Sequence, residues 1–162
     1  MLGGGSPMLD ALGNLGDFIG GIAIVITLIY LAVQVRQNTR AIRVATMQSL
    51  MLAAQNIAIL AAQDRDLARV VRVGLATPDE LDENEFQQFR YFLMSMLRVH
   101  EDMFVQHQAG VVDDQTWIAR SSSLKTIFSM PGGRRIWKAS SAYRDDFKAW
   151  LESELDHESP AA

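Results

Sequence analysis

Cysteine is absent from the 162 residues of this chain. Without it the protein has no disulfides, no thiolate metal sites and no thiol catalysis. The absence also suits a domain that stays in a reducing cytoplasm. Runs of alternating apolar and polar residues are missing too, as are internal repeats and low-complexity segments. Because such alternation marks a half-buried strand, the chain is predicted to be all-α.

Charged side chains are scarce in the first part of the chain. Residues 1–35 carry only Asp10 and Asp17, and residues 36–63 carry only three arginines. Residues 64–162 hold the remaining 29 charges, 12 basic and 17 acidic. That balance predicts an ordinary soluble domain with a mildly acidic surface, which is a poor match for nucleic acid. We therefore expect no nucleic-acid partner.

An uncharged run, FIGGIAIVITLIYLAVQV, extends from Phe18 to Val35, and eleven of its 18 residues are Leu, Ile, Val or Phe. As a helix it measures about 27 Å, and Leu15 and Gly16 bring it close to the roughly 30 Å of a bilayer core. A signal peptide would need a basic start and a small-residue cleavage site, which this segment lacks. A buried soluble helix would need a larger core than the rest of the chain supplies. The run therefore predicts a transmembrane helix over residues 15–37.

Basic residues follow this run and none precedes it. Because short cytoplasmic flanks are enriched in Lys and Arg, this asymmetry places the N-terminus outside and the following domain in the cytoplasm. The expected order is a flexible N-terminus over 1–14, the span, a helical cytoplasmic domain over 38–156 and a flexible C-terminus over 157–162. The basic residues that set the orientation are Arg36, Arg40 and Arg43.

Residues 44–63 carry no charge, no Gly and no Pro, so the first helix is predicted to continue through them. A second membrane span would be a poor one with so many polar groups, and we favour a helix buried against protein. That protein is either the same chain or another copy. An apolar flank holds Met47, Leu50, Ala54, Ile57 and Ala61, and a polar flank holds Gln48, Gln55, Asn56 and Gln63.

Capping residues divide the rest of the chain into helices. Asp64 is predicted to begin a short helix that ends at Thr77-Pro78. Asp82 and Glu85 have the spacing of a capping box, which opens a long helix. Further boundaries are predicted at Ala109-Gly110, at Asp113 or Asp114, at Ser129, and at a turn formed by Pro131-Gly132-Gly133, after which two short helices follow.

Two sets of residues in the span are candidates for contacts. A G-x-x-x-G pattern permits close approach of helices, although it also arises by chance. The predicted helix-packing face consists of Gly13, Gly16, Gly20, Gly21 and Ala23. A polar seam consists of Thr27, Tyr30 and Gln34. Tyr30 and Gln34 are interpreted as interfacial anchors, with hydrogen bonds between protomers or the lining of a narrow path as alternatives.

Five ionisable residues crowd one predicted helix: Arg98, His100, Glu101, Asp102 and His107. Arg98 lies three residues before Glu101 and four before Asp102, a spacing that favours a structural ion pair. The two histidines are too far apart to bind one metal, and the Glu-x-x-His pairs of di-metal bundles are absent. Phosphate-binding and serine-nucleophile motifs are absent as well. We therefore predict no catalytic, cofactor-binding or metal-binding residues, and no enzyme.

Aromatic and basic residues are interleaved near the C-terminus. On short helices such a pattern suits either docking onto anionic lipid or a core in which the basic side chains stay solvated. We favour the core interpretation. The apolar members are Trp137, Tyr143, Phe147, Trp150 and Leu151, and the basic ones are Arg134, Arg135, Lys138, Arg144 and Lys148.

The segment TLIYLAVQVRQNTRAIR, from Thr27 to Arg43, resembles the end of the N-terminal span in a family of uncharacterised bacterial single-pass membrane proteins, which carry a TLxYLAxQxRQNT signature. Val35 stands where that family more often has Ile. The resemblance continues through R-x-x-E-x-x-F and G-x-x-D…W segments and an FxxWLxxEL-like helix. It implies a bacterial inner-membrane protein and no particular activity. The matching residues are Arg98, Glu101, Phe104, Gly110, Asp113, Trp117 and Phe147–Leu155.

Three functions fit these patterns. The first is a non-enzymatic membrane protein that contacts lipid and acts by self-assembly or as an accessory subunit of a larger membrane complex. The second is a homo-oligomeric channel or transporter-like pore lined by the polar seam. The third is a membrane-proximal lipid-binding or enzymatic domain that uses Arg98, His100 and Glu101. That third function requires these residues to face a cavity.

Overall fold

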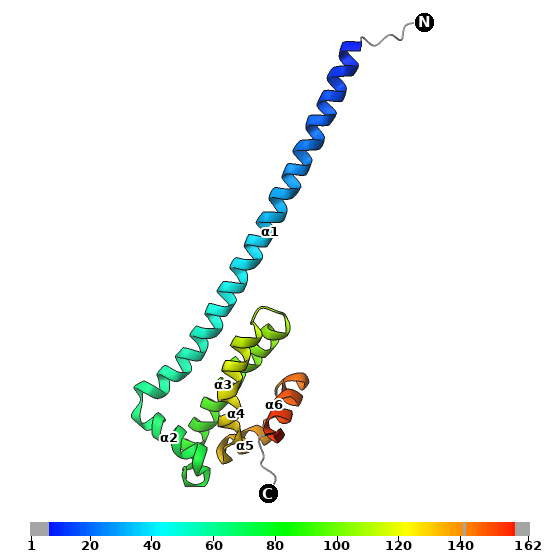
Figure 1. Ribbon diagram of the computed structural model, residues 1–162. Helices are drawn as coiled ribbons and strands as arrows, with labels where there is room; N and C mark the ends of the chain where they lie inside the picture. The colour runs from blue at the N-terminus through cyan, green and yellow to red at the C-terminus, as the bar shows by residue number, and fades with distance from the viewer. Residues whose placement is uncertain (1–6, 141, 158–162) are drawn as a thin grey trace. The chain divides into compact units, whose positions relative to one another are not determined.

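The computed structural model describes residues 7–140 and 142–157. Every regular element in these residues is helical, with six α-helices and one short 3-10 helix, so the all-α prediction is confirmed (Figure 1). The chain divides into two units, residues 1–44 and residues 45–162. The first helix, α1, contributes to both units.

Helix α1 (Pro7–Gln63) is a single uninterrupted helix of 57 residues. It begins earlier than expected, because residues 7–14, predicted as part of a flexible N-terminus, are helical. Pro7 occupies the first position, where its fixed φ favours a helix, and an apolar run follows directly. Residues 1–6 of that prediction lie outside the described residues. At the other terminus His157 still belongs to a helix, and residues 158–162 lie outside the described part.

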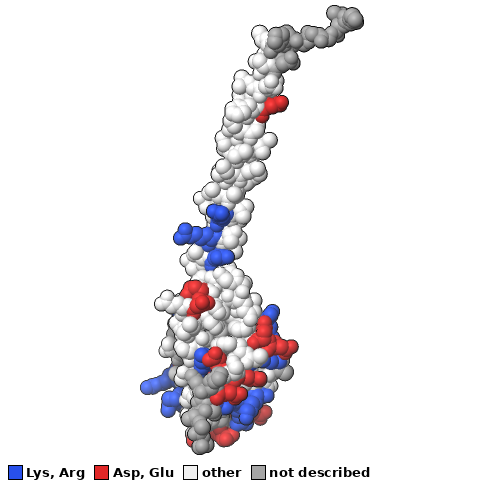
Figure 2. Space-filling view, turned by 45° about the vertical axis from the view of Figure 1, so that its right-hand side comes forward, with Lys and Arg blue, Asp and Glu red and all other residues white. Residues whose placement is uncertain are grey.

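Helix α1 is the one described helix that is long and apolar enough to cross a membrane, as judged from its length and composition. Every residue from Ala11 to Ala45 is exposed. In Figure 2 the charged atoms gather mainly on the second unit, while the visible surface of α1 is largely uncharged.

The second unit contains the C-terminal part of α1 and six further elements. Asp64 caps the first of them, since its side chain accepts hydrogen bonds from the backbone of Asp66 (2.9 Å) and Leu67 (3.0 Å). Both bonds of the predicted capping box between Asp82 and Glu85 are present. The elements are α2 (Arg65–Ala76), η1 (Pro78–Glu80), α3 (Glu83–Gln108), α4 (Asp114–Ser129), α5 (Pro131–Lys138) and α6 (Asp145–His157).

Two other predicted boundaries are confirmed. Gly110 adopts a φ of 70°, the left-handed conformation that glycine tolerates after the end of a helix. Asp113, rather than Asp114, caps α4 by accepting a hydrogen bond from the backbone of Thr116 at 2.9 Å. Local capping chemistry therefore specifies where these helices begin and end.

The predicted turn at Pro131-Gly132-Gly133 is wrong, because these residues form the first turn of α5. A Cβ atom at Gly132 would overlap the carbonyl oxygen of Gly74 in α2. One at Gly133 would overlap the carbonyl oxygen of Ile127 in α4. The glycines are thus present for close packing of three helices and not for a change of chain direction.

The core of the second unit is built from α2 to α6 and is rich in aromatic rings. The rings of Phe104 and Phe147 meet edge to face at 5.5 Å, and those of Trp117 and Trp150 lie 4.8 Å apart. The apolar residues near the C-terminus belong to this core, as predicted, and among them Phe147 and Leu151 are fully buried. Lipid docking by these aromatic side chains is therefore not the reason for the interleaved pattern.

Candidate functional site

The predicted helix-packing face has open space along its glycines. A Cβ atom at Gly13, Gly16, Gly20 or Gly21 would meet nothing within 4 Å apart from neighbouring parts of its own helix. Ala23 is exposed as well. Contacts within the described chain therefore do not require small residues at these positions.

Two hydrogen bonds within α1 involve the polar seam. The Thr27 hydroxyl donates to the Ala23 carbonyl oxygen at 2.8 Å. The Gln34 amide donates to the Tyr30 hydroxyl at 2.8 Å. Each of the three side chains therefore already has one hydrogen-bond partner about one turn away in its own helix.

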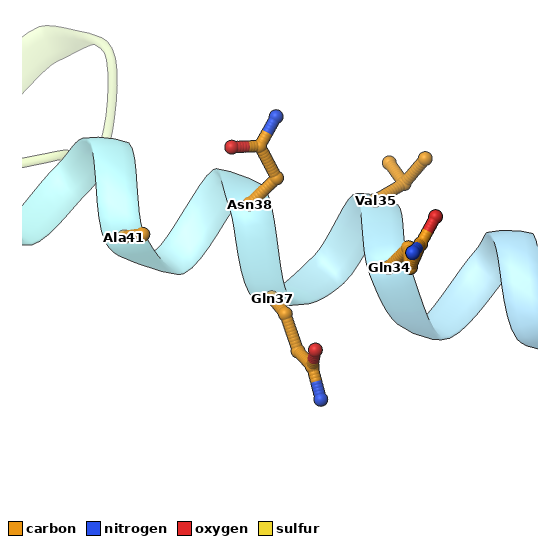
Figure 3. Close-up of a pocket in the computed structure, with 5 residues that line it drawn as sticks. All are labelled: Gln34, Val35, Gln37, Asn38 and Ala41. Carbon is orange, nitrogen blue, oxygen red and sulfur yellow. The ribbon is translucent and has the colours of Figure 1, made fainter.

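A shallow hollow lies at the C-terminal end of the apolar run of α1 (Figure 3). It is lined by Gln34, Val35, Gln37, Asn38 and Ala41, all from consecutive turns of this one helix. The side chains of Val35 and Asn38 point to one side in the close-up, whereas Gln37 points to the other. The hollow is thus a groove on a helix surface and not an enclosed site. Exposed Arg36, Arg40 and Arg43 occupy the same stretch of helix.

The C-terminal part of α1, residues 45–63, has two distinct faces. On one face, Met47, Leu50 and Met51 pack against the core of the second unit. All five residues of the predicted apolar flank are partly buried, and all four of the polar flank are exposed. The prediction of a helix buried against protein is therefore confirmed for one face only.

The other face of this segment exposes three large apolar side chains among the polar ones. Leu52 is 58% exposed, Ile59 45% and Leu60 58%. Leu52 and Ile59 lie seven residues apart, as successive core positions do in a coiled coil. We name these three residues the outer stripe. The sequence analysis did not predict the outer stripe. It assigned this side of the helix to the polar flank and did not consider the apolar residues between the polar ones.

Arg98 and Glu101 form an ion pair of 3.1 Å within α3. The buried Glu101 carboxylate also accepts a hydrogen bond from the backbone of Arg144 at 2.6 Å. The Arg98 guanidinium lies 4.9 Å from the centre of the Tyr143 ring. Both oxygens of Glu101 therefore have partners. One oxygen binds Arg98 within α3, and the other holds the segment before α6 against α3. Asp102 is exposed and belongs to no ion pair among the described residues.

The two histidines of α3 have separate partners. His100 Nδ1 lies 2.8 Å from the Met96 carbonyl oxygen, and His107 Nδ1 lies 3.1 Å from that of Val112. The His107 ring also stacks on Trp117 at 5.4 Å. Within the described residues no three His, Asp or Glu side chains come together as a metal site would need.

Burial lowers the pKa of His100 below its ordinary value, and the nearby Arg120 charge lowers it further, while backbone hydrogen bonds involving Met96 and Arg120 oppose both effects. His100 is therefore neutral at pH 7. Its ring belongs to the wall of a cavity between α1, α3 and α4.

No family model, no curated protein and no solved structure matches this chain.

Proposed function

We propose that this protein is a non-enzymatic, membrane-anchored helical protein that acts by self-assembly through α1. The observation that carries the proposal is the outer stripe, an exposed apolar surface on the charge-free part of α1 that follows the three arginines. With 57 residues, α1 is about 85 Å long, nearly three times the roughly 30 Å hydrocarbon core of a bilayer. Lipid can cover only part of such a helix. Apolar side chains on the part beyond the bilayer stay exposed to water unless a protein surface covers them.

The placement of the protein is part of the proposal. Residues 15–37 would cross the cytoplasmic membrane of a bacterium, with Arg36, Arg40 and Arg43 at the inner headgroups. Residues 45–63 would then lie in the aqueous phase of the cytoplasm. An apolar stripe exposed to water there favours association, whereas the same stripe within lipid would not.

A second copy suits the outer stripe better than an unrelated partner does. Two copies anchored in one membrane have parallel α1 helices, so the stripe of one faces the same stripe of the other in register. Confinement to the membrane also raises their effective concentration. Burial of three half-exposed side chains stabilises a dimer by on the order of 3 kcal/mol per chain. The glycines of the helix-packing face would allow close approach within the bilayer.

The test is the mass of the full-length protein in native nanodiscs, measured by native mass spectrometry. We expect a discrete homo-oligomer, and we expect the double variant Leu52→Gln/Ile59→Gln to be monomeric. Ile118→Gln is the matched control, since Ile118 is 66% exposed but lies on α4. Gly16→Ile/Gly20→Ile tests the contribution of the helix-packing face separately.

The other outcomes point to other functions. A wild-type monomer would contradict self-assembly and would favour an accessory subunit that buries the outer stripe against a different protein. A ring of protomers that conducts ions in liposomes would favour the pore. The internal hydrogen bonds of Thr27 and Gln34 make the polar seam a weaker basis for that function than the outer stripe is for assembly.

A further inference from the structure

A partly enclosed cavity of about 250 Å³ lies within the second unit, between the C-terminal part of α1 and helices α3 and α4. Its walls are mainly apolar and include Ala54 and Ile57 from α1, Phe92 and Met96 from α3, and Ile127 from α4. Ligand pockets typically combine such walls with a few convergent polar groups. The cavity meets that description, and none of the residues that line it belongs to the outer stripe.

The shape of the cavity follows from the residue types around it. Small side chains at Ala54 and Ala58, one helical turn apart, leave room where larger ones would fill the gap between α1 and α3. Methionine side chains at Met96 and Met103 line the space, and their unbranched thioethers adapt to the outline of a bound apolar chain. The cavity is therefore apolar, with small side chains on its α1 side and flexible methionine side chains on its α3 side.

One permanent charge lies at this cavity. Arg120 of α4 lines it, is exposed, and forms no ion pair among the described residues. The other polar groups are already engaged, because Ser123 donates its hydroxyl to the Arg120 carbonyl oxygen at 2.8 Å and His100 Nδ1 lies 2.8 Å from the Met96 carbonyl oxygen. The free guanidinium is therefore the group that selects the ligand's headgroup. Guanidinium recognises a carboxylate through two parallel hydrogen bonds.

We propose that this cavity binds a medium-chain fatty acid, with the acyl chain between α1, α3 and α4 and the carboxylate on Arg120. The size agrees with that class, since 250 Å³ corresponds to about eight groups of water or methylene size at roughly 30 Å³ each. Octanoate therefore fills the cavity with its chain and leaves its carboxylate at the arginine. Neither the cavity nor Arg120 takes part in the proposed assembly surface.

The experiment uses the full-length protein in nanodiscs and an octanoate probe with a diazirine in its chain. After irradiation, mass spectrometry of peptides locates the label. We expect labelling of Ile57, Phe92 or Met96, and we expect excess octanoate to compete it away. Octanol should compete at least about tenfold less well, because it lacks the carboxylate that Arg120 recognises.

Two variants and one control test the residues. Arg120→Gln should weaken octanoate competition about tenfold and bring octanoate and octanol close together. Arg72→Gln is the matched control, because Arg72 is exposed on α2, away from the cavity, and without an ion pair in the described structure. Ala54→Phe should abolish labelling by filling the cavity. Should Ala54→Phe fail to fold, the Arg120→Gln variant and the octanol comparison still decide the matter.

Two results would overturn the proposal. The first is labelling that falls only on residues 15–37, which would reflect partition of the probe into the bilayer. The second is equal competition by octanoate and octanol in the wild type, which would leave no role for Arg120. Both results are independent of the oligomeric state, so failure of this proposal is distinguishable from failure of self-assembly.

Discussion

At the scale of the residue, Glu101 is a buried charged side chain that connects two segments of the second unit. It is buried, and its carboxylate joins the Arg98 side chain to the backbone of Arg144, which lies 43 positions further along the chain. The sequence spacing predicts the contact with Arg98, since three residues in a helix bring two side chains together. The spacing does not predict the contact with Arg144. The donor there is a backbone N–H, which nearly every residue has, so the sequence does not show which one the carboxylate meets.

The Glu101 contacts lead to a prediction on stability. Glu101→Ala leaves the Arg144 N–H and the Arg98 side chain without their acceptor, so the free energy of unfolding should fall by about 2 to 3 kcal/mol. Glu101→Gln keeps one acceptor oxygen and should lose about half as much. Chemical denaturation of the full chain in nanodiscs, followed by tryptophan fluorescence, measures both. The neighbouring exposed Asp102 provides the control, and Asp102→Ala should change the value by less than about 0.5 kcal/mol. Equal losses at both positions would contradict a structural role specific to Glu101.

At the scale of the element, the chain specifies its helix boundaries by local chemistry. The predicted caps at Asp64 and Asp82 are present, and Asp113 is the cap at the boundary predicted for Asp113 or Asp114, because a side-chain acceptor needs only the next three residues to be satisfied. The first turn of α5 is the exception. Pro-Gly-Gly is a turn signal by local propensity, and tertiary packing overrides it where α5 must approach the backbones of α2 and α4.

This close approach makes Gly132 intolerant of a side chain. Gly132→Ala places a methyl group on the Gly74 carbonyl oxygen, so α5 must shift away from α2, and we expect a loss of roughly 2 kcal/mol or more in the free energy of unfolding. Gly13→Ala is the matched control, because nothing lies within 4 Å of a Cβ there and alanine is the better helix former. Denaturation midpoints compare the two variants. An unaffected Gly132→Ala protein would contradict the packing of α5 on α2.

At the scale of the whole molecule, α1 combines an exposed apolar segment with a segment that packs on the core of the second unit. Its charge asymmetry is the basis for the proposed orientation, in which the second unit lies in the cytoplasm. The absence of cysteine makes this orientation simple to test, because any introduced thiol is the only one present.

The orientation prediction uses single cysteines on either side of residues 15–37. In intact bacterial cells, Met8→Cys should react with a membrane-impermeant maleimide, whereas Gln115→Cys on α4 should react only after the cells are permeabilised. Both positions are exposed, so accessibility within the protein is matched. The reverse pattern would place the second unit outside. Labelling of both in intact cells would contradict a transmembrane α1.

The sequence alone determined the all-helical class, the apolar segment of α1, the two flanks of residues 44–63 and most helix boundaries. Each depends on periodicity, composition or contacts within one helical turn, which a linear chain displays directly. Tertiary structure decided the rest, namely the packing role of the Gly132-Gly133 pair, the contact between Glu101 and Arg144, the outer stripe and the cavity beside Arg120. Those features arise where residues distant in sequence meet or fail to meet, and only the packing of helices settles which surfaces are covered and which stay open.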